Sequence, residues 1–303
     1  MADSTSLAAD KFRLIDAAAL VFVAVMYGAI FPLNRLAAEA QWPPVGFAFL
    51  QSLVAGVVLL VVILLRGERF LLTKQHLLAY AILGGLVIGL PIGILVTAAE
   101  HLDASVVTLV LCLSPILTLF IGAIAGLERF NRSTFLGMLL GTAGIVMIAM
   151  PDAGIIGAGT VGWFLLALLA PVMFAIANNC AKWLRPEGAS SITMAAGTLL
   201  GAAAVSFVVM LGFGGAMMPP ETTSASLLPL IIATSINAVF FALFFYLVGA
   251  IGPARFSLFN YLAVAAGILW SLAIFSERPA SLFWVALLLM VAGMYLALSR
   301  RLG

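Results

Sequence analysis

Long apolar stretches alternate with short polar segments along the whole chain. Stretches of at least 18 residues without Asp, Glu, Lys or Arg occupy 17–34, 40–65, 77–99, 104–127, 133–151, 153–181, 188–220, 222–254, 256–276 and 279–299. An α-helix rises 1.5 Å per residue, so about 20 residues cross a hydrocarbon layer of about 30 Å. The pattern therefore predicts ten membrane-spanning segments.

These segments are expected to be helices. Transmembrane β-strands alternate polar and apolar residues over about ten positions, whereas runs such as AGVVLLVV at 55–62 are apolar throughout. A helix also satisfies its own backbone hydrogen bonds, which lipid cannot do. The predicted fold class is an all-α membrane protein of ten transmembrane helices.

The composition excludes a soluble globular domain. Hydrophobic residues make up 64% of the 303 positions and charged residues only 9%, whereas soluble domains have about 25% charged residues. The first residues, through Asp16, mix polar and charged side chains and lack the apolar core of a cleavable signal sequence. We expect residues 1–14 to form a cytoplasmic tail.

The distribution of Lys and Arg predicts the orientation. With the N-terminus inside, the inner segments contain twelve cations and the outer segments contain two, Arg35 and Arg278. The inner twelve are Lys11, Arg13, Arg66, Arg69, Lys74, Arg129, Arg132, Lys182, Arg185, Arg255, Arg300 and Arg301. Because cations concentrate in cytoplasmic loops, both termini are predicted to be cytoplasmic.

An internal repeat divides the chain into two halves. Glu-Arg pairs at 128–129 and 277–278 lie 149 residues apart, and Ala-Gly pairs at 143–144 and 292–293 have the same offset. We expect one five-helix half over 15–151 and a second over 152–303. Five is odd, so the second half begins on the opposite side of the membrane. Such inverted repeats are typical of transporters that open alternately to each side.

The motifs of this repeat resemble those of the EamA-type repeat of the drug/metabolite transporter superfamily. The segments that carry the resemblance are 26–32, 102–105, 113–115, 127–130 and 137–144. Tyr27 stands where the family usually has tryptophan, and Val264 replaces the proline in the second half. Within the superfamily the chain is most similar to the YddG-type exporters of aromatic and other amino acids. The resemblance implies a bacterial inner-membrane exporter whose central cavity is lined by helices 1–4 and 6–9, with helices 5 and 10 at the periphery.

Aromatic and amide side chains inside the apolar segments are the candidate solute-binding residues. They are Tyr27, Tyr80, Trp163, Asn178, Asn237, Phe244, Tyr246, Asn260 and Tyr261. Trp163 shares a helix face with Asn178 and with Pro171, which is expected to kink the helix. Trp163 fits an interfacial anchor equally well. Asn237 is expected near the midplane, where an amide needs a partner or water.

Two further features of the predicted helices are interpreted as structural. His76 lies close to the basic inner loop and is interpreted as an exposed surface group. Glycines recur every four residues in two segments and are interpreted as sites of close helix packing. These glycines are at positions 85, 89 and 93 and at positions 137 and 141.

Charged residues are missing from the interiors of the predicted helices. Proton-coupled carriers and exporters of cationic drugs usually need a carboxylate there, and sugar-phosphate carriers need cations. A neutral or zwitterionic solute remains. An amino acid fits, because helix ends, amides and hydroxyls can meet its two charges. Passage without ion coupling is the simpler hypothesis.

An enzyme is not expected. The two histidines, His76 and His101, are predicted on opposite sides, and no catalytic triad, Walker loop or zinc-protease motif occurs. We expect no catalytic residue, metal, cofactor or nucleic-acid partner. The expected partners are the lipid bilayer and a small-molecule solute, bound by a monomer or, alternatively, a dimer. Export of drugs or nucleosides, carriage of sugar phosphates, and a non-transporting membrane scaffold stay open.

Overall fold

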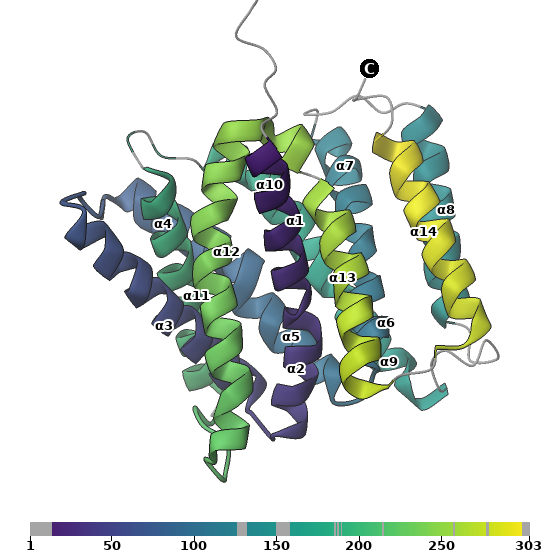
Figure 1. Ribbon diagram of the computed structural model, residues 1–303, viewed down its shortest axis with the longest axis horizontal. Coiled ribbons are helices and arrows are strands. Elements are labelled where there is room, and N and C mark those ends of the chain that lie inside the picture. The colour runs from purple at the N-terminus through teal and green to yellow at the C-terminus, as the bar shows by residue number, and fades with distance from the viewer. Residues whose placement is uncertain are drawn as a thin grey trace, which may run out of the picture.

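The apolar stretches form helices that run up and down through the molecule (Figure 1). The structure is a computed structural model that describes residues 14–125, 132–149, 158–184, 186, 188, 190–213, 215–256, 258–276 and 279–298. Within these ranges there is no β-strand.

Helices follow one another along both halves of the chain. The first half contains α1 (Leu14–Gly28), α2 (Ile30–Glu39), α3 (Pro44–Leu65), α4 (Lys74–Gly84), the π-helix η1 (Gly85–Gly89), α5 (Leu90–Ala99), α6 (Ala104–Val110), the 3₁₀ turn η2 (Leu111–Leu113), α7 (Ser114–Ile124) and α8 (Arg132–Ala149). The second half contains η4 (Ala158–Thr160), α9 (Val161–Ala167), α10 (Leu169–Trp183), α11 (Ser191–Phe213), α12 (Ser224–Phe256), α13 (Leu258–Phe275) and α14 (Ser281–Leu298).

Six helical stretches of the described chain are long and apolar enough to cross a membrane. They are Ala18–Glu39, Pro44–Leu65, Lys74–Ala99, Val161–Cys180, Ser191–Phe213 and Ser224–Phe244. Large apolar side chains cover their outer surface, for example Leu65 at 82% and Leu211 at 66% exposure. So much exposed apolar surface is stable in lipid and not in water. The protein is therefore an all-helical integral membrane protein.

Breaks precede proline residues in three of these stretches and in the segment 104–124. A proline has no N–H, so the carbonyl four residues before it loses its helical partner. The breaks are at Ala29 before Pro32, at η1 before Pro91, at η2 before Pro115 and at Leu168 before Pro171. The interruption at Leu168 lies one turn before Pro171, where a kink is expected, and the other three breaks are additional to the expected helices.

α8 and α14 lie side by side at one edge of the bundle (Figure 1). A Cβ atom added to Gly293 would lie 2.5 Å from the carbonyl oxygen of Gly137 and 2.8 Å from the nitrogen of Gly141. Small residues are needed where two backbones approach this closely. The packing interpretation of Gly137 and Gly141 is thereby confirmed, and these two helices do lie at the periphery.

α11 packs equally closely against α3 and α4. A Cβ atom on Gly84 would collide with the carbonyl oxygen of Thr198, and one on Gly201 with the carbonyl oxygen of Tyr80. Farther along, a Cβ atom on Gly89 would lie 3.0 Å from the carbonyl oxygen of Ala202. These contacts bring the first half of the chain against the second.

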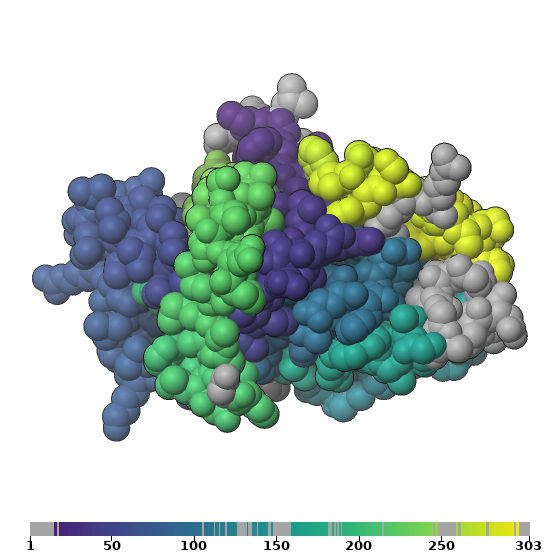
Figure 2. All heavy atoms as spheres, turned by 90° about the horizontal axis from the view of Figure 1, so that it is seen from below, coloured from purple at the N-terminus to yellow at the C-terminus, as the bar shows by residue number. Residues whose placement is uncertain are grey.

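The helices make different contacts at the two ends of the bundle. We call these ends the Glu39 end, where α2 ends, and the Leu14 end, where α1 begins and α14 ends (Figure 1). At the Glu39 end, α2 packs against α5, α6, α12 and α13. At the Leu14 end, α1 packs against α12 and α13 and has no comparable contact with the described residues of α4, α7 or α10. Figure 2 looks onto the Glu39 end, where α2 lies between the start of α12 and the turn joining α5 to α6.

His76 is buried, which corrects the interpretation of it as a surface group. Its side chain is only 5% exposed. Thr73 caps the start of α4 and its hydroxyl lies 2.7 Å from Nδ1 of His76. The loop before α4 also folds over this region, because the Phe70 ring stacks on Tyr80 at 5.6 Å. Proximity to a charged loop in the sequence therefore did not imply exposure.

Candidate solute-binding site

A buried pair of amides joins α3 to α12. Nδ2 of Asn237 donates a hydrogen bond of 2.8 Å to Oε1 of Gln51. The two residues are 2% and 0% exposed. Asn237 thus has the hydrogen-bond partner that a buried amide requires. Nε2 of Gln51 has no hydrogen-bond partner in the described part of the chain.

A third buried amide, Asn34, lies on α2, which also packs against α12. Asn34 is 0% exposed, and neither its Oδ1 nor its Nδ2 has a partner among the described residues. An unpaired buried polar group costs about 1–3 kcal/mol. Polar groups of this kind inside a membrane protein are candidates for binding water or solute.

An aromatic cluster begins one helical turn from Asn237. The Tyr27 ring lies 4.2 Å from Phe240 and 5.6 Å from Phe259, measured between ring centroids. Phe240 in turn lies 5.7 Å from Phe244. Phe240 and Phe259 are buried, whereas Tyr27 and Phe244 are half-buried. The cluster is therefore a surface on which an apolar or aromatic group can stack.

A second polar set joins α7 to α10. Nδ2 of Asn178 donates to Oγ1 of Thr118 at 3.3 Å, and Nδ2 of Asn179 donates to the carbonyl oxygen of Thr118 at 3.0 Å. Asn178 is exposed. An exposed amide on a membrane helix is stable where it meets water, because lipid offers no hydrogen-bond partner. This face of α10 is therefore suited to line a hydrated space.

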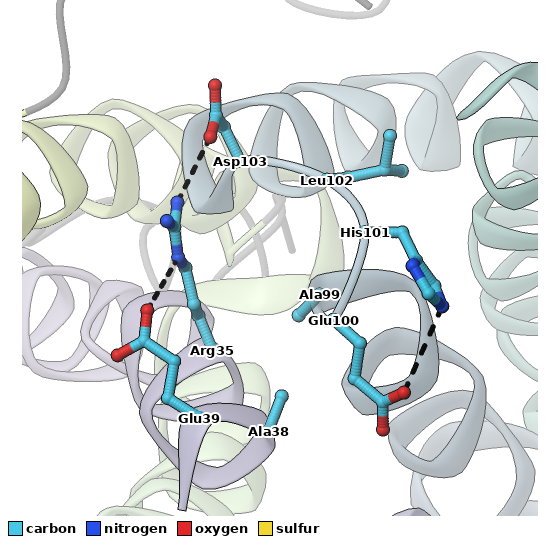
Figure 3. Close-up of a pocket in the computed structure, with 8 residues that line it drawn as sticks. All are labelled: Arg35, Ala38, Glu39, Ala99, Glu100, His101, Leu102 and Asp103. Atoms are coloured by element: carbon cyan, nitrogen blue, oxygen red, sulfur yellow. Dashed lines mark hydrogen bonds and ion pairs between the residues drawn. The ribbon is translucent and has the colours of Figure 1, made fainter. Parts of the chain in front are cut away.

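A cleft of about 300 Å³ opens at the Glu39 end (Figure 3). Its lining residues are Arg35, Ala38, Glu39, Ala99, Glu100, His101, Leu102 and Asp103. Figure 3 shows Arg35 and Glu39 on one wall and Glu100 and His101 on the facing wall. Just outside this set, the Trp163 ring stacks on His101 at 4.0 Å. Trp163 therefore lies near the mouth of the cleft.

The structure brings three of the nine candidate residues together. Tyr27 and Phe244 both contact Phe240, which lies one turn along α12 from Asn237. Asn178 lies apart from them on α10, where it bonds to Thr118 of α7. Trp163 lies at the Glu39 end.

Two other candidates, Tyr80 and Tyr246, are not part of this group. Tyr80 is 3% exposed and packs with Leu83 and Met194 in a separate cluster. Tyr246 is 53% exposed. Asn260 and Tyr261 lie in α13, but their side chains are outside the described part.

Sequence reasoning missed Gln51 and Asn34. Asn34 is the one amide of the apolar stretch 17–34, and Gln51 lies deep inside the stretch 40–65, whose other amide, Gln41, is at its start. An amide deep in an apolar stretch indicates a paired or functional position, since hydrocarbon disfavours an unpaired amide. The hydrogen-bond partner of Gln51 could not be identified from the sequence, because Asn237 is 186 residues away in the chain.

The described interior is nearly free of charge. Asp16, at 6% exposure, is its one buried carboxylate and lies at the start of α1. No group of three or more His, Cys, Asp or Glu residues that could hold a metal ion occurs in the described residues. The site can therefore act through amides, hydroxyls and aromatic rings.

Comparisons with known proteins point to transport. The profile of the EamA-like transporter family matches residues 15–150 and 161–299. The uncharacterized inner membrane transporter YedA of Escherichia coli K12 is 25% identical over 89% of this chain and 86% of its own length. The uncharacterized transporter YvbV of Bacillus subtilis is 27% identical over 90% and 87%, respectively. One solved crystal structure has the same fold, with a TM-score of 0.63, 23% identity, and coverage of 94% of this chain and 99% of the other.

Proposed function

Because this chain belongs to the EamA-like transporter family, we propose that it exports neutral or zwitterionic amino acids, including aromatic ones, by alternating access. The buried amide pair Gln51–Asn237 beside the Tyr27 aromatic cluster is the observation that carries the proposal. The amides can bind the polar head of an amino acid, and the rings can stack against its side chain.

The proposed architecture has ten spans in two inverted halves. The spans run over 14–39, 44–65, 74–99, 104–124, 132–149, 161–183, 191–213, 224–256, 258–275 and 281–298. The family profile matches twice, once in each half, which supports a repeat. Several spans are shorter than 20 residues, which is within the range seen for membrane helices.

Helix contacts support a two-fold relation between the halves, and the odd number of spans in each half makes that relation an inverted one. α1 packs on α13 and α7 packs on α10, so the first span meets the ninth and the fourth meets the sixth. α3 packs on α12 and α4 on α11, so the second span meets the eighth and the third meets the seventh. Exchanging the two halves converts the first–ninth contact into the fourth–sixth contact, and the second–eighth contact into the third–seventh contact. A pseudo-two-fold axis in the membrane plane produces this relation.

We propose that the Leu14 end is cytoplasmic. Arg66 and Arg69 lie in the connection between α3 and α4 at that end, and Lys74 is the first residue of α4. Cations favour the cytoplasmic side. We propose that a cavity opens to the cytoplasm between α1 and the helices α4, α7 and α10, whose described residues make few contacts with α1. The packing of α2 against four other helices corresponds to a closed outer side. Tyr27, Phe244 and Asn178 are the proposed solute contacts from the cytoplasmic side, and Trp163 lies at the outer side.

Transport without ion coupling is part of the proposal. Asp16 is the one buried carboxylate of the described chain, and it lies at the start of α1, at the Leu14 end. Arg35, the cation at the outer cleft, is already paired with Glu39 and Asp103. The described residues therefore include no deep carboxylate to carry a proton, and Arg35 is not available to bind a phosphate. Neither observation favours a proton-driven or a sugar-phosphate carrier.

Flux into liposomes tests the proposed function. Purified protein should exchange labelled phenylalanine or leucine for unlabelled amino acid with no imposed proton gradient. Asn237→Ala should reduce this flux while Tyr295→Ala, a change at an exposed tyrosine of α14, should leave it unchanged. Strict dependence on a proton gradient would refute the uncoupled mechanism. Flux of nucleosides, drugs or sugar phosphates in place of amino acids would refute the solute class, and no flux of any of them would favour a scaffold.

A further inference from the structure

Arg35 connects three helices at the Glu39 end. Its Nη1 lies 3.1 Å from Oδ1 of Asp103, the residue before α6. Its guanidinium carbon lies 4.5 Å from the centre of the Phe275 ring, at the end of α13. Arg35 itself belongs to α2 (Figure 3). One side chain thus joins α2 to a neighbour in each half of the chain.

The bond to Glu39 differs from the other two contacts. Nε of Arg35 lies 3.1 Å from Oε1 of Glu39, one turn away on the same helix. This pair orients the guanidinium but cannot hold two helices together. The contacts with Asp103 and Phe275 can do so, because each crosses from α2 to another helix.

An apolar seam lies behind these contacts. Phe31 of α2, Ala98 of α5 and Leu102 belong to one buried cluster and are at most 6% exposed. Phe31 also contacts α13, since a Cβ atom on Gly267 would collide with its ring. The Arg35 contacts lie at the rim of this seam, at the end of the bundle where the two halves meet.

The strength of these contacts suits a reversible closure. The side chains of Arg35 and Asp103 are 25% and 59% exposed. Solvent-exposed ion pairs are weak and sensitive to salt, and a cation over an aromatic ring adds a modest further attraction. Such contacts can hold two helices together and still break in each transport cycle.

We propose that Arg35 is the latch of the outer gate. Its contacts with Asp103 and Phe275 hold the outer ends of α2, α6 and α13 together in the inward-open state. Opening to the outside requires both contacts to break. Arg35 is a positioning residue, and it acts on the equilibrium between inward-open and outward-open states. The inference rests on the alternating access and the orientation proposed above.

A single cysteine behind the latch measures this equilibrium. Ala98 is 0% exposed in the seam, and Ala98→Cys adds only a sulfur atom. The change is made in a Cys112→Ser, Cys180→Ser background. A charged, membrane-impermeant maleimide is added to the outside of intact cells, and the rate of labelling reports how often the outer side opens. No transported solute is needed.

Arg35→Gln, which removes both contacts, should speed labelling about threefold to thirtyfold, the factor that corresponds to roughly 0.7–2 kcal/mol. Asp103→Asn, which removes the ion pair alone, should speed it about twofold to fivefold, which corresponds to roughly 0.4–1 kcal/mol. Glu39→Gln is the matched control, because it removes a charge from the same cleft without breaking a contact between helices. Its labelling rate should stay within about twofold of the parent. Equal rates in all four proteins, or an equal increase in the Glu39→Gln variant, would overturn the latch.

Two further measurements keep the inference testable if a variant folds poorly. The charge swap Arg35→Asp with Asp103→Arg should label more slowly than Arg35→Asp alone, because the ion pair is restored with reversed polarity. Raising the ionic strength should speed labelling of the parent and leave the Arg35→Gln variant unchanged. A swap that labels as fast as the single variant, or a salt effect that persists without Arg35, would contradict the proposal.

Failure of the latch is distinguishable from failure of the proposed function. Slow labelling that responds to Arg35 supports a gate even when amino acid flux is absent, because the maleimide reports opening alone. Normal amino acid flux with labelling that ignores Arg35 and Asp103 refutes the latch and leaves the transport function standing.

Discussion

The amide of Asn237 donates to the amide oxygen of Gln51 at 2.8 Å across the contact between α3 and α12. Both residues are buried, and they come from opposite halves of the chain. Removing one partner should leave the other amide unpaired, whereas removing both should leave an apolar contact.

Single and double leucine variants of this pair test that relation. Gln51→Leu and Asn237→Leu should each lower the free energy of unfolding by about 1–3 kcal/mol, because each leaves a buried polar group unpaired. The double variant should recover most of this loss, and thermal unfolding in detergent measures all three. If the losses of the two single variants add in the double variant, the hydrogen bond between the two amides is not the cause of the destabilisation. A double variant that is stable but transports no amino acid would further support the pair as a solute contact.

Tyr27 provides a test of the aromatic surface. Its ring lies 4.2 Å from Phe240, and such ring contacts are worth about 0.5–1.5 kcal/mol. Tyr27→Leu should raise the half-saturation concentration for phenylalanine by about 2- to 13-fold relative to that for leucine, which corresponds to the same energies. Tyr27→Phe should not, because it keeps the ring. Competition flux assays with the two amino acids decide this, and an equal effect of both substitutions would point to the hydroxyl instead.

The helix break at Ala29 predicts a role for Pro32. Pro32→Ala supplies an N–H to the carbonyl of Gly28 and should join α1 and α2 into one helix. A straight helix would lose the bend on which the different packing of α1 and α2 depends. Maximal flux should therefore fall while the protein stays folded. Pro44→Ala is the control, because a proline at the first position of α3 removes no helical hydrogen bond; similar flux in both variants would dismiss the break as incidental.

The contact between α4 and α11 predicts different outcomes for two glycines of one helix. Gly201→Ala should lower the free energy of unfolding by about 1–3 kcal/mol, because the new methyl group would collide with the carbonyl oxygen of Tyr80. Gly212→Ala should be neutral or stabilising, since nothing lies within 4 Å of its added Cβ atom. Thermal unfolding of the two variants compares them directly. A tolerated Gly201→Ala would mean that the two helices can separate at little cost.

The sequence by itself was sufficient for the membrane class and for most of the helices. Apolar stretches of membrane length have one stable arrangement in lipid, the helix, because the backbone must satisfy its own hydrogen bonds. The close packing at Gly137 and Gly141 and a helix interruption next to Pro171 were also predictable, since both depend on a residue's own backbone chemistry.

Only the tertiary structure showed which polar groups meet. The pairing of Gln51 with Asn237, 186 residues apart, depends on how α3 packs against α12. Tyr27 and Tyr80 have similar apolar surroundings in the sequence, yet one joins the aromatic cluster beside this pair and the other lies between α4 and α11. Hydrophobicity is nondirectional, so it buries both rings without specifying their neighbours. The contacts between helices choose those neighbours, and they also determine that Arg35 bridges α2, α6 and α13 at one end of the bundle.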